Sequence, residues 1–223
     1  MAPVVTDWMR SMGLTVKPEF HLPWGICDLV GVSLNGDRVA HRLELKQREA
    51  IGSITSAAIL LQIPDIETRR SASIESLFRQ YSGVMLKSEV EAVVDRLVAG
   101  HFVQRTRGGR LRKINGWLPL EDRLMAVELK LFRIDEAMQQ AKDHLEFATE
   151  SYAAFPLDVA AKVTSQSWRW SRYLDAGVGV VSVDQEKCEV VLSPRNLREP
   201  VDAAIRAYSV EKFWRTRTKD KTS

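Results

Sequence analysis

The stretch that decides the fold is Leu124-Met-Ala-Val-Glu-Leu-Lys-Leu-Phe132, which is apolar except for Glu128 and Lys130. Its apolar residues are nearly continuous, which predicts a strand buried on both faces. A helix is expected next, because apolar residues recur at helical spacing at Ile134, Ala137, Met138, Ala141, Leu145 and Ala148. Ser151–Phe155 then predicts a short strand. A strand, a helix and a strand in this order form a parallel crossover, so we expect an α/β (α+β) fold with a mixed central sheet flanked by helices.

The residues before this unit predict antiparallel strands. Leu14–Phe20 alternates like an edge strand, and Ile26–Leu34 is apolar on both faces apart from Asp28. Asn35-Gly36-Asp37 is typical of a hairpin turn. The return strand is therefore expected at Arg38–Leu45.

The middle of the chain has a different pattern, which predicts three helices followed by a two-stranded ribbon. The helices are expected near Ile54–Ile63, near Glu75–Gln80 and from Lys87 to Gly100, and the ribbon turns at Gly108-Gly109. This order resembles a winged helix-turn-helix. We therefore expect a core made of residues 1–46 and 115–223, with a winged-helix domain inserted at residues 47–114.

Composition excludes several classes of protein. The 223 residues include only two cysteines and four scattered histidines, with no pair at zinc-ligand spacing, which disfavours a zinc or haem protein. The longest apolar run, Ala57–Leu61, is far shorter than the roughly 20 residues that span a bilayer. No secretory signal is visible at the N-terminus. We expect a cytoplasmic protein that does not bind a membrane.

Three charged residues in strands expected to be buried indicate a metal site. Glu128 and Lys130 share one face of their strand, since alternate residues point the same way, and Asp28 interrupts another apolar strand. Burying an unpaired charge costs several kcal/mol, and a divalent cation between two carboxylates would compensate for it. Carboxylates favour Mg²⁺, with Mn²⁺ as an alternative.

These residues resemble the PD-(D/E)XK, or restriction-endonuclease-like, nuclease superfamily. The resemblance rests on Cys27-Asp28, on Glu128-Leu129-Lys130 and on Gln139-Gln140-Ala141 in the next helix, although Cys27 replaces the usual proline before the aspartate. It implies that Asp28 and Glu128 bind metal and that Lys130 supports the attacking water. It also implies that Gln140 positions the water or the phosphate, with Glu19 as an additional candidate ligand.

A second E-x-K sequence, Glu44-Leu45-Lys46, is an alternative to Glu128 and Lys130. It follows Asp28 across the expected hairpin, which is also a normal spacing for this superfamily. No strand is expected for some 55 residues after Lys46, whereas a helix and a strand follow Lys130. The sequence therefore favours the later pair.

Basic residues gather on the expected ribbon and could contact phosphates. They are Arg105, Arg107, Arg110, Arg112 and Lys113, and Lys87 begins the preceding helix. That helix also carries Glu89, Glu91 and Asp95, which repel phosphate and disfavour sequence-specific recognition in the major groove.

We therefore expect a metal-dependent DNA endonuclease whose winged-helix insert contacts DNA. The partner is expected to be nucleic acid, with DNA favoured over RNA, and a homodimer or a protein partner remains an alternative. The alternative function is that of a catalytically inactive DNA-binding or adaptor protein on a nuclease-like fold.

Overall fold

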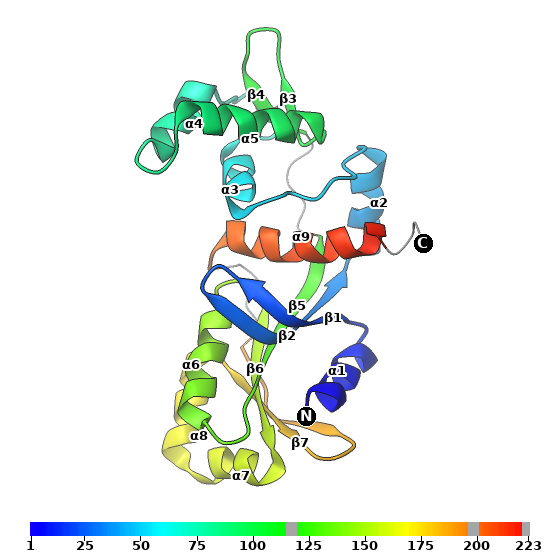
Figure 1. Cartoon of the computed structure of the whole chain (residues 1–223), viewed down its shortest axis with the longest axis vertical. Coiled ribbons are helices and arrows are strands. Elements are labelled where there is room, and N and C mark those ends of the chain that lie inside the picture. Colours follow the sequence, from blue (N-terminus) through cyan, green and yellow to red (C-terminus); the bar gives the residue numbers. More distant parts are fainter. Residues whose placement is uncertain (115–119, 196–200, 220–223) are drawn as a thin grey trace. The chain divides into compact units, whose positions relative to one another are not determined.

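Contacts between residues divide the chain into two units, each built from two segments of sequence. The computed structural model describes residues 1–114, 120–195 and 201–219, with side chains described up to residue 214 (Figure 1). The first unit consists of Met1–Leu34 and Glu121–Arg206. The second unit consists of Asn35–Leu120 and Ala207–Ser223. The predicted insert at 47–114 lies within the second unit, which begins earlier in the chain and also includes most of the last helix.

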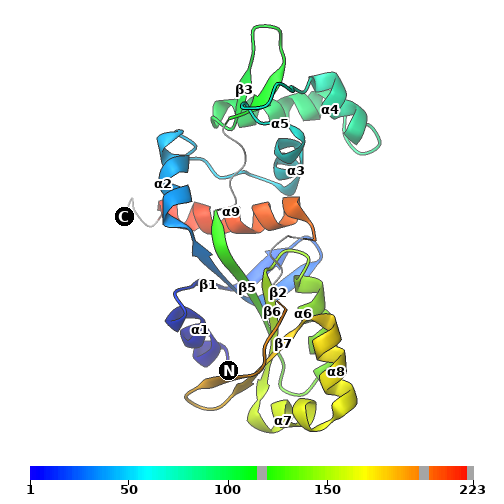
Figure 2. The ribbon, with the colours of Figure 1, turned by 180° about the vertical axis from the view of Figure 1, so that it is seen from behind.

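A six-stranded mixed sheet forms the centre of the first unit (Figure 2). Its strands, in spatial order, are β1 (Thr15–Leu22), β2 (Gly25–Leu34), β5 (Glu121–Leu129), β6 (Glu150–Pro156), β7 (Gly179–Val183) and β8 (Cys188–Leu192). The pairs β5–β6 and β6–β7 are parallel, and the other three neighbouring pairs are antiparallel. The predicted mixed sheet and the parallel crossover from β5 to β6 are both confirmed.

Helices cover both faces of this sheet. Helix α1 (Ala2–Ser11) packs Val5 and Met9 against one face, and it lies so close to β2 that a Cβ at Gly31 would come within 2.8 Å of Met9 Cε. The other face packs against three helices, α6 (Ile134–His144), α7 (Leu157–Ser165) and α8 (Ser167–Ala176). The sheet is therefore buried between two apolar layers, as continuous apolar strands require.

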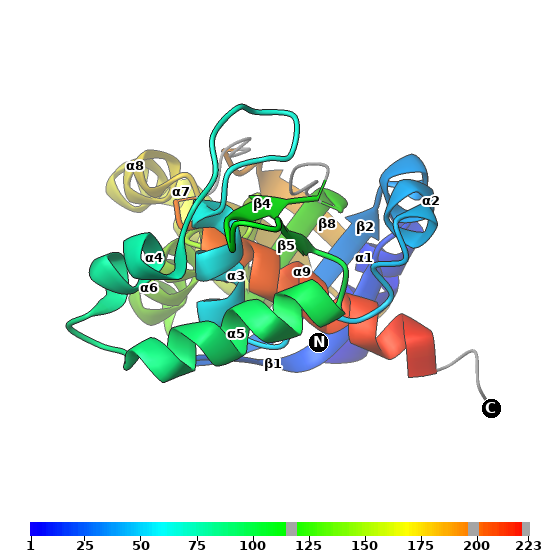
Figure 3. The same cartoon turned by 90° about the horizontal axis from the view of Figure 1, so that it is seen from above.

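The second unit is mainly helical. It contains α2 (Gly36–Glu44), α3 (Ile54–Gln62), α4 (Ile74–Tyr81), α5 (Lys87–Ala99), the short strands β3 (Val103–Arg105) and β4 (Leu111–Lys113), and most of α9 (Ala203–Lys219). Helix α5 contacts α3, α4 and β3, and Figure 3 shows it beside the β3–β4 ribbon. No helix in the described ranges is both long enough and apolar enough to cross a membrane.

The return strand predicted at Arg38–Leu45 is wrong, because these residues form α2. Asn35 has an extended backbone, with φ −69° and ψ 118°, and its side-chain oxygen accepts a hydrogen bond from the Arg38 N–H at 3.0 Å. Asparagine favours both hairpin turns and helix N-caps, and here the capping geometry is the one adopted. Glu44 therefore ends a helix, and Lys46 follows it with a left-handed φ of 61°.

A buried ion pair joins the two segments of the second unit. Arg42 on α2 is 3% exposed and Glu211 on α9 is 1% exposed, and two hydrogen bonds of 2.5 and 3.0 Å connect them. The Glu211 carboxylate also accepts from the Ile51 N–H at 2.8 Å. The guanidinium lies 4.3 Å from the ring centroid of Trp214. Both buried charges therefore have partners: the guanidinium contacts Glu211 and Trp214, and the carboxylate accepts from Arg42 and from the Ile51 N–H.

Removing one member of this pair should strongly destabilise the protein. The single variants Arg42→Met and Glu211→Leu each leave one buried charge unpaired, which typically costs about 3–5 kcal/mol. The double variant should lose less than the sum of the two. Urea unfolding followed by circular dichroism measures both effects.

Arg172→Met is the matched control, because Arg172 forms an exposed pair with Asp135 at 2.7 Å. Exposed pairs contribute about 0–1 kcal/mol. An Arg42→Met variant as stable as this control would contradict the prediction.

Candidate functional site

The pairing of β2 with β5 brings the predicted acids together. The two strands are antiparallel with Leu29 opposite Val127, so Asp28 and Glu128 adjoin one position farther along. The Leu129 N–H donates a hydrogen bond of 2.7 Å to Asp28 Oδ2. Residues 100 positions apart in the sequence therefore meet at one point of the sheet.

Asp28, Glu128 and Lys130 form the centre of a cluster of polar side chains at this point. Glu128 is buried, at 2% exposed. Its Oε1 lies 2.9 Å from Lys130 Nζ, and its Oε2 lies 3.4 Å from His144 Nε2. Desolvation by burial raises the pKa of Glu128, the hydrogen bond from Lys130 opposes this shift, and the nearby charge of Asp28 adds to it. Burial therefore destabilises the charged form of Glu128, and a cation close to the carboxylate stabilises it.

Lys130 supplies one such partner. It directly follows β5, and its Nζ also lies 3.3 Å from Glu136 Oε1 at the start of α6. Burial lowers the pKa of Lys130, but hydrogen bonds and charge from Glu128 and Glu136 outweigh that effect and raise the pKa overall. Lys130 is therefore an ammonium that can stabilise negative charge.

His144 and Cys27 complete the cluster, and sequence reasoning missed both. Burial lowers the pKa of His144 to about 4, so its imidazole is neutral beside Glu128. Cys27 is fully buried on β2, and its thiol donates to the Leu29 carbonyl at 3.3 Å. Donor atoms of Cys27, Glu128 and His144 all lie within 4.8 Å of one another. The three residues come from different elements, so no local spacing in the sequence could reveal them.

The remaining predicted site residues differ in how they relate to this cluster. Gln140 lies on α6 one turn before His144, and its buried Oε1 has no hydrogen-bond partner among the described residues. Gln139 is exposed and donates to Asp143 at 2.7 Å. Glu19 lies exposed on β1 with a left-handed φ of 47° and does not belong to the buried cluster. Of the two glutamines, Gln140 is the one that faces inward.

The alternative pair, Glu44 and Lys46, does not lie on a strand. Glu44 ends α2 in the second unit, where its carboxylate lies 3.5 Å from His41 Nδ1. The strand that would have aligned Glu44 and Lys46 on one face is absent, because Asn35 starts a helix there. Glu128 and Lys130, by contrast, lie at the end of β5 with Glu128 Oε1 2.9 Å from Lys130 Nζ.

The basic ribbon residues are presented in different ways. Arg105 pairs with Asp95 on α5 at 2.7 Å, and Arg110 donates to Ser71 Oγ at 3.0 Å. Arg107 is exposed at the ribbon turn, and none of the hydrogen bonds or ion pairs within the described chain involves it. The ribbon therefore carries at least one exposed guanidinium with no partner in the described part of the chain.

The other basic candidates are less available. Lys113 is 8% exposed and lies 3.4 Å from Asp65, so its ammonium does not face solvent as a phosphate-contacting lysine should. Lys87 pairs with Glu75 at 2.6 Å on the surface. Arg112 is half-buried on β4, with a buried Nε that has no hydrogen-bond partner among the described residues.

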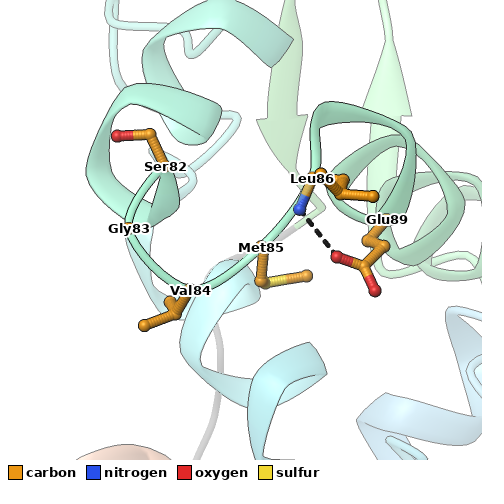
Figure 4. Close-up of a pocket in the computed structure, with 6 residues that line it drawn as sticks. All are labelled: Ser82, Gly83, Val84, Met85, Leu86 and Glu89. Atoms are coloured by element: carbon orange, nitrogen blue, oxygen red, sulfur yellow. Dashed lines mark hydrogen bonds between the residues drawn. The ribbon is translucent and has the colours of Figure 1, made fainter.

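A shallow pocket of about 260 Å³ lies at the turn between α4 and α5 (Figure 4). Ser82, Gly83, Val84, Met85, Leu86 and Glu89 line it. Its one acid, Glu89, accepts a hydrogen bond from the Leu86 N–H at 2.6 Å, which caps α5. With that carboxylate committed to the helix end, the pocket offers no catalytic group comparable to the cluster around Glu128.

Comparison with known proteins adds no functional assignment. No family model and no curated protein matches the chain. Among solved structures, SPO1766, a protein of unknown function from Silicibacter pomeroyi, is similar at 18% identity with a TM-score of 0.32. The match covers 57% of this chain and 82% of the other. A similarity of this degree carries no argument about fold or activity.

Replacing Lys130 should show how strongly it compensates for Glu128. Lys130→Met leaves Glu128 Oε1 without its cation, which should cost about 1–3 kcal/mol of unfolding free energy. The loss should shrink as the pH is lowered, because Glu128, whose pKa is raised, then takes up a proton and becomes neutral. Urea unfolding at a series of pH values tests this.

Arg133→Met is the control, since Arg133 is exposed and its ion pair with Glu136, at 3.0 Å, lies on the surface. Its effect should be small at every pH. A Lys130→Met loss that is independent of pH would show that Lys130 acts through packing instead of charge.

Proposed function

We propose that this protein is a metal-dependent endonuclease of the PD-(D/E)XK type that hydrolyses phosphodiester bonds in DNA. The observation that carries the proposal is the convergence of Asp28, Glu128 and Lys130. The Leu129 N–H donates to Asp28 at 2.7 Å, and the Glu128 carboxylate lies 2.9 Å from Lys130 Nζ. Two acids and one ammonium from adjacent central strands are the groups that metal-assisted phosphodiester hydrolysis requires.

The residues present fit Mg²⁺, with Mn²⁺ as the alternative ion. Asp28 and Glu128 are hard oxygen donors, the ligands that Mg²⁺ prefers, and the β2–β5 pairing places them side by side. These two carboxylates would hold the ion, which when bound would polarise a phosphoryl oxygen and acidify a water molecule.

The chain's own residues have separate roles in this proposal. Lys130 keeps its proton at Nζ and presents positive charge where negative charge develops on the phosphate. Gln140 has a buried, unpartnered amide oxygen that can accept a hydrogen bond from the attacking water. Glu136 holds Lys130 from the other side at 3.3 Å, which fixes the position of the ammonium.

We further propose that α3, α4, α5, β3 and β4 form a winged helix whose ribbon contacts DNA. The exposed Arg107 at the ribbon turn favours phosphate contacts, and Arg105, Arg110 and Arg112 lie on or beside the same ribbon. We leave Lys113 out of this surface because it is buried. The acids of α5 favour binding that does not depend on sequence, since they oppose entry of this helix into the major groove.

A second function is that of a DNA-binding or adaptor protein without catalytic activity. Two observations favour it: Glu128 is only 2% exposed, and Cys27 occupies the position before Asp28. A carboxylate this buried reaches a substrate-bound ion only if that ion is itself deep in the protein.

Metal-dependent cleavage tests the main proposal. Plasmid and oligonucleotide DNA incubated with Mg²⁺ or Mn²⁺ should be cut, and EDTA should stop the reaction. Asp28→Asn, Glu128→Gln and Lys130→Met should each lower the rate by roughly 10²–10⁴-fold, the range typical of lost acid–base or charge-stabilising groups.

Glu44→Gln is the matched control, because it changes the other E-x-K sequence, and it should cut at the wild-type rate. Equal loss in Glu44→Gln would contradict the assignment. DNA binding without turnover on any substrate would favour the adaptor function.

Salt-dependent binding tests the winged helix. Arg107→Ala and Arg110→Ala should each weaken DNA binding and reduce the slope of log K against log salt by about 1, because each removes one phosphate contact. Fluorescence anisotropy with a duplex measures both quantities. Lys162→Ala removes one exposed charge from α7 in the first unit and should leave the slope unchanged. Equal slopes for all the variants would exclude the ribbon as the DNA-contacting surface.

A further inference from the structure

A second kind of metal chemistry lies beside the proposed Mg²⁺ ligands. Cys27 on β2, Glu128 on β5 and His144 at the end of α6 each point one donor atom toward the others, and these atoms lie within 4.8 Å of one another. All three side chains are buried, and His144 is 5% exposed. A thiol, a carboxylate and an imidazole are therefore gathered where water has little access.

Several buried polar atoms of this cluster have no hydrogen-bond partner among the described residues. Glu128 Oε2 and both ring nitrogens of His144 are buried without a hydrogen-bond partner in the described part of the chain. Such groups cost roughly 1–3 kcal/mol each when they stay unpaired, so a native protein normally satisfies them. Nearby in the sequence, Gln140 Oε1 on the same side of α6 is also unpaired.

The separation of the Glu128 and His144 donor atoms fits two ligands of one ion better than two groups bridged by a water molecule. Glu128 Oε2 and His144 Nε2 are 3.4 Å apart. Two ligands about 2.0–2.1 Å from a tetrahedral Zn²⁺ are separated by about 3.4 Å. A water that bridged them with ordinary hydrogen bonds would hold them about 4.5 Å apart.

We propose that Cys27, Glu128 and His144 form a buried site for a divalent transition metal ion, with Zn²⁺ as its natural occupant. Sulfur and imidazole donors favour Zn²⁺, Co²⁺ or Fe²⁺ over Mg²⁺, which prefers oxygen alone. On binding, the Cys27 thiol releases its proton to solvent and a metal–sulfur bond forms, while His144 binds as the neutral imidazole. This site goes beyond the proposed nuclease function and stands even if the protein cuts no DNA.

The two oxygens of Glu128 separate this site from the predicted catalytic groups. Oε1 faces Lys130 at 2.9 Å, and Oε2 faces His144 at 3.4 Å. Asp28 is not one of the three donors. The Zn²⁺ site can therefore be tested with variants that do not alter Asp28, and the Mg²⁺ site can be tested with Asp28→Asn alone.

Co²⁺ is the probe, because a thiolate bound to it gives charge-transfer absorption that oxygen ligands do not. The untagged full chain is stripped with EDTA and titrated with Co²⁺, and Zn²⁺ is then added. We expect the absorption to saturate at one ion per chain and to disappear when one equivalent of Zn²⁺ displaces the cobalt. Native mass spectrometry should show a single bound Zn²⁺.

Cys27→Ser and His144→Gln should abolish the cobalt absorption and weaken Zn²⁺ binding by more than the roughly 10–100-fold that loss of an outer-shell partner costs. Cys188→Ser is the matched control, because Cys188 is the other cysteine and lies on β8 outside the cluster. Asp28→Asn should keep the absorption while losing Mg²⁺-dependent cleavage, which separates this inference from the proposed function.

The inference is overturned if wild-type protein shows no thiolate-to-cobalt absorption, or if Cys27→Ser retains it with unchanged circular dichroism. Loss of the absorption in Cys188→Ser would also overturn it, since the thiolate would then be the wrong one. Absence of metal binding in wild-type protein would mean that Glu128 and His144 simply contact each other directly.

Discussion

The desolvation of the Glu128 carboxylate is the constraint on which the site depends. A carboxylate removed from water loses several kcal/mol of hydration, and the protein must replace that hydration with fixed partners. Lys130 provides a cation from the position directly after the same strand, β2 contributes Asp28 and Cys27, and α6 places His144 opposite Oε2. Glu128 lies on β5 and His144 lies on α6, the next helix of the β5–α6–β6 crossover. The topology of the sheet therefore determines which residues meet at the site.

Much of the first unit could be predicted from the sequence, because the spacing of apolar residues within each short segment indicates its strands and helices. Continuous apolar residues mark β5 and β6, helical spacing marks α6, and together they specify a parallel crossover without knowledge of any distant contact. The second unit shows the limit of this approach. Asn35 suits a hairpin and a helix cap equally well in a short window. What distinguishes the two is Arg42, which as part of a helix meets Glu211 from a segment 169 residues away.

The residues of the candidate site also differ in whether the sequence could predict them. Asp28, Glu128 and Lys130 could be identified because a charge inside an apolar strand is conspicuous in the sequence alone. Cys27 and His144 could not, since a buried cysteine resembles any small apolar residue and a single histidine on a helix has no partner at a fixed spacing. Lys113 shows the opposite error: it belongs to a basic run, yet the pairing of β4 with β3 turns it inward toward Asp65. Charge can be counted from sequence, but its exposure depends on the fold.

The discontinuous make-up of the second unit has a consequence for how the protein forms during translation. Glu211 lies beyond every residue of the first unit, so the ribosome must complete both segments of that unit before Arg42 can gain its counter-ion. Until then the nascent α2–β4 region carries a guanidinium whose native surroundings are incomplete. The central sheet can therefore assemble early, whereas the helical unit matures only once α9 has emerged. A stalled or prematurely released chain would expose this unfinished half to chaperones and proteases.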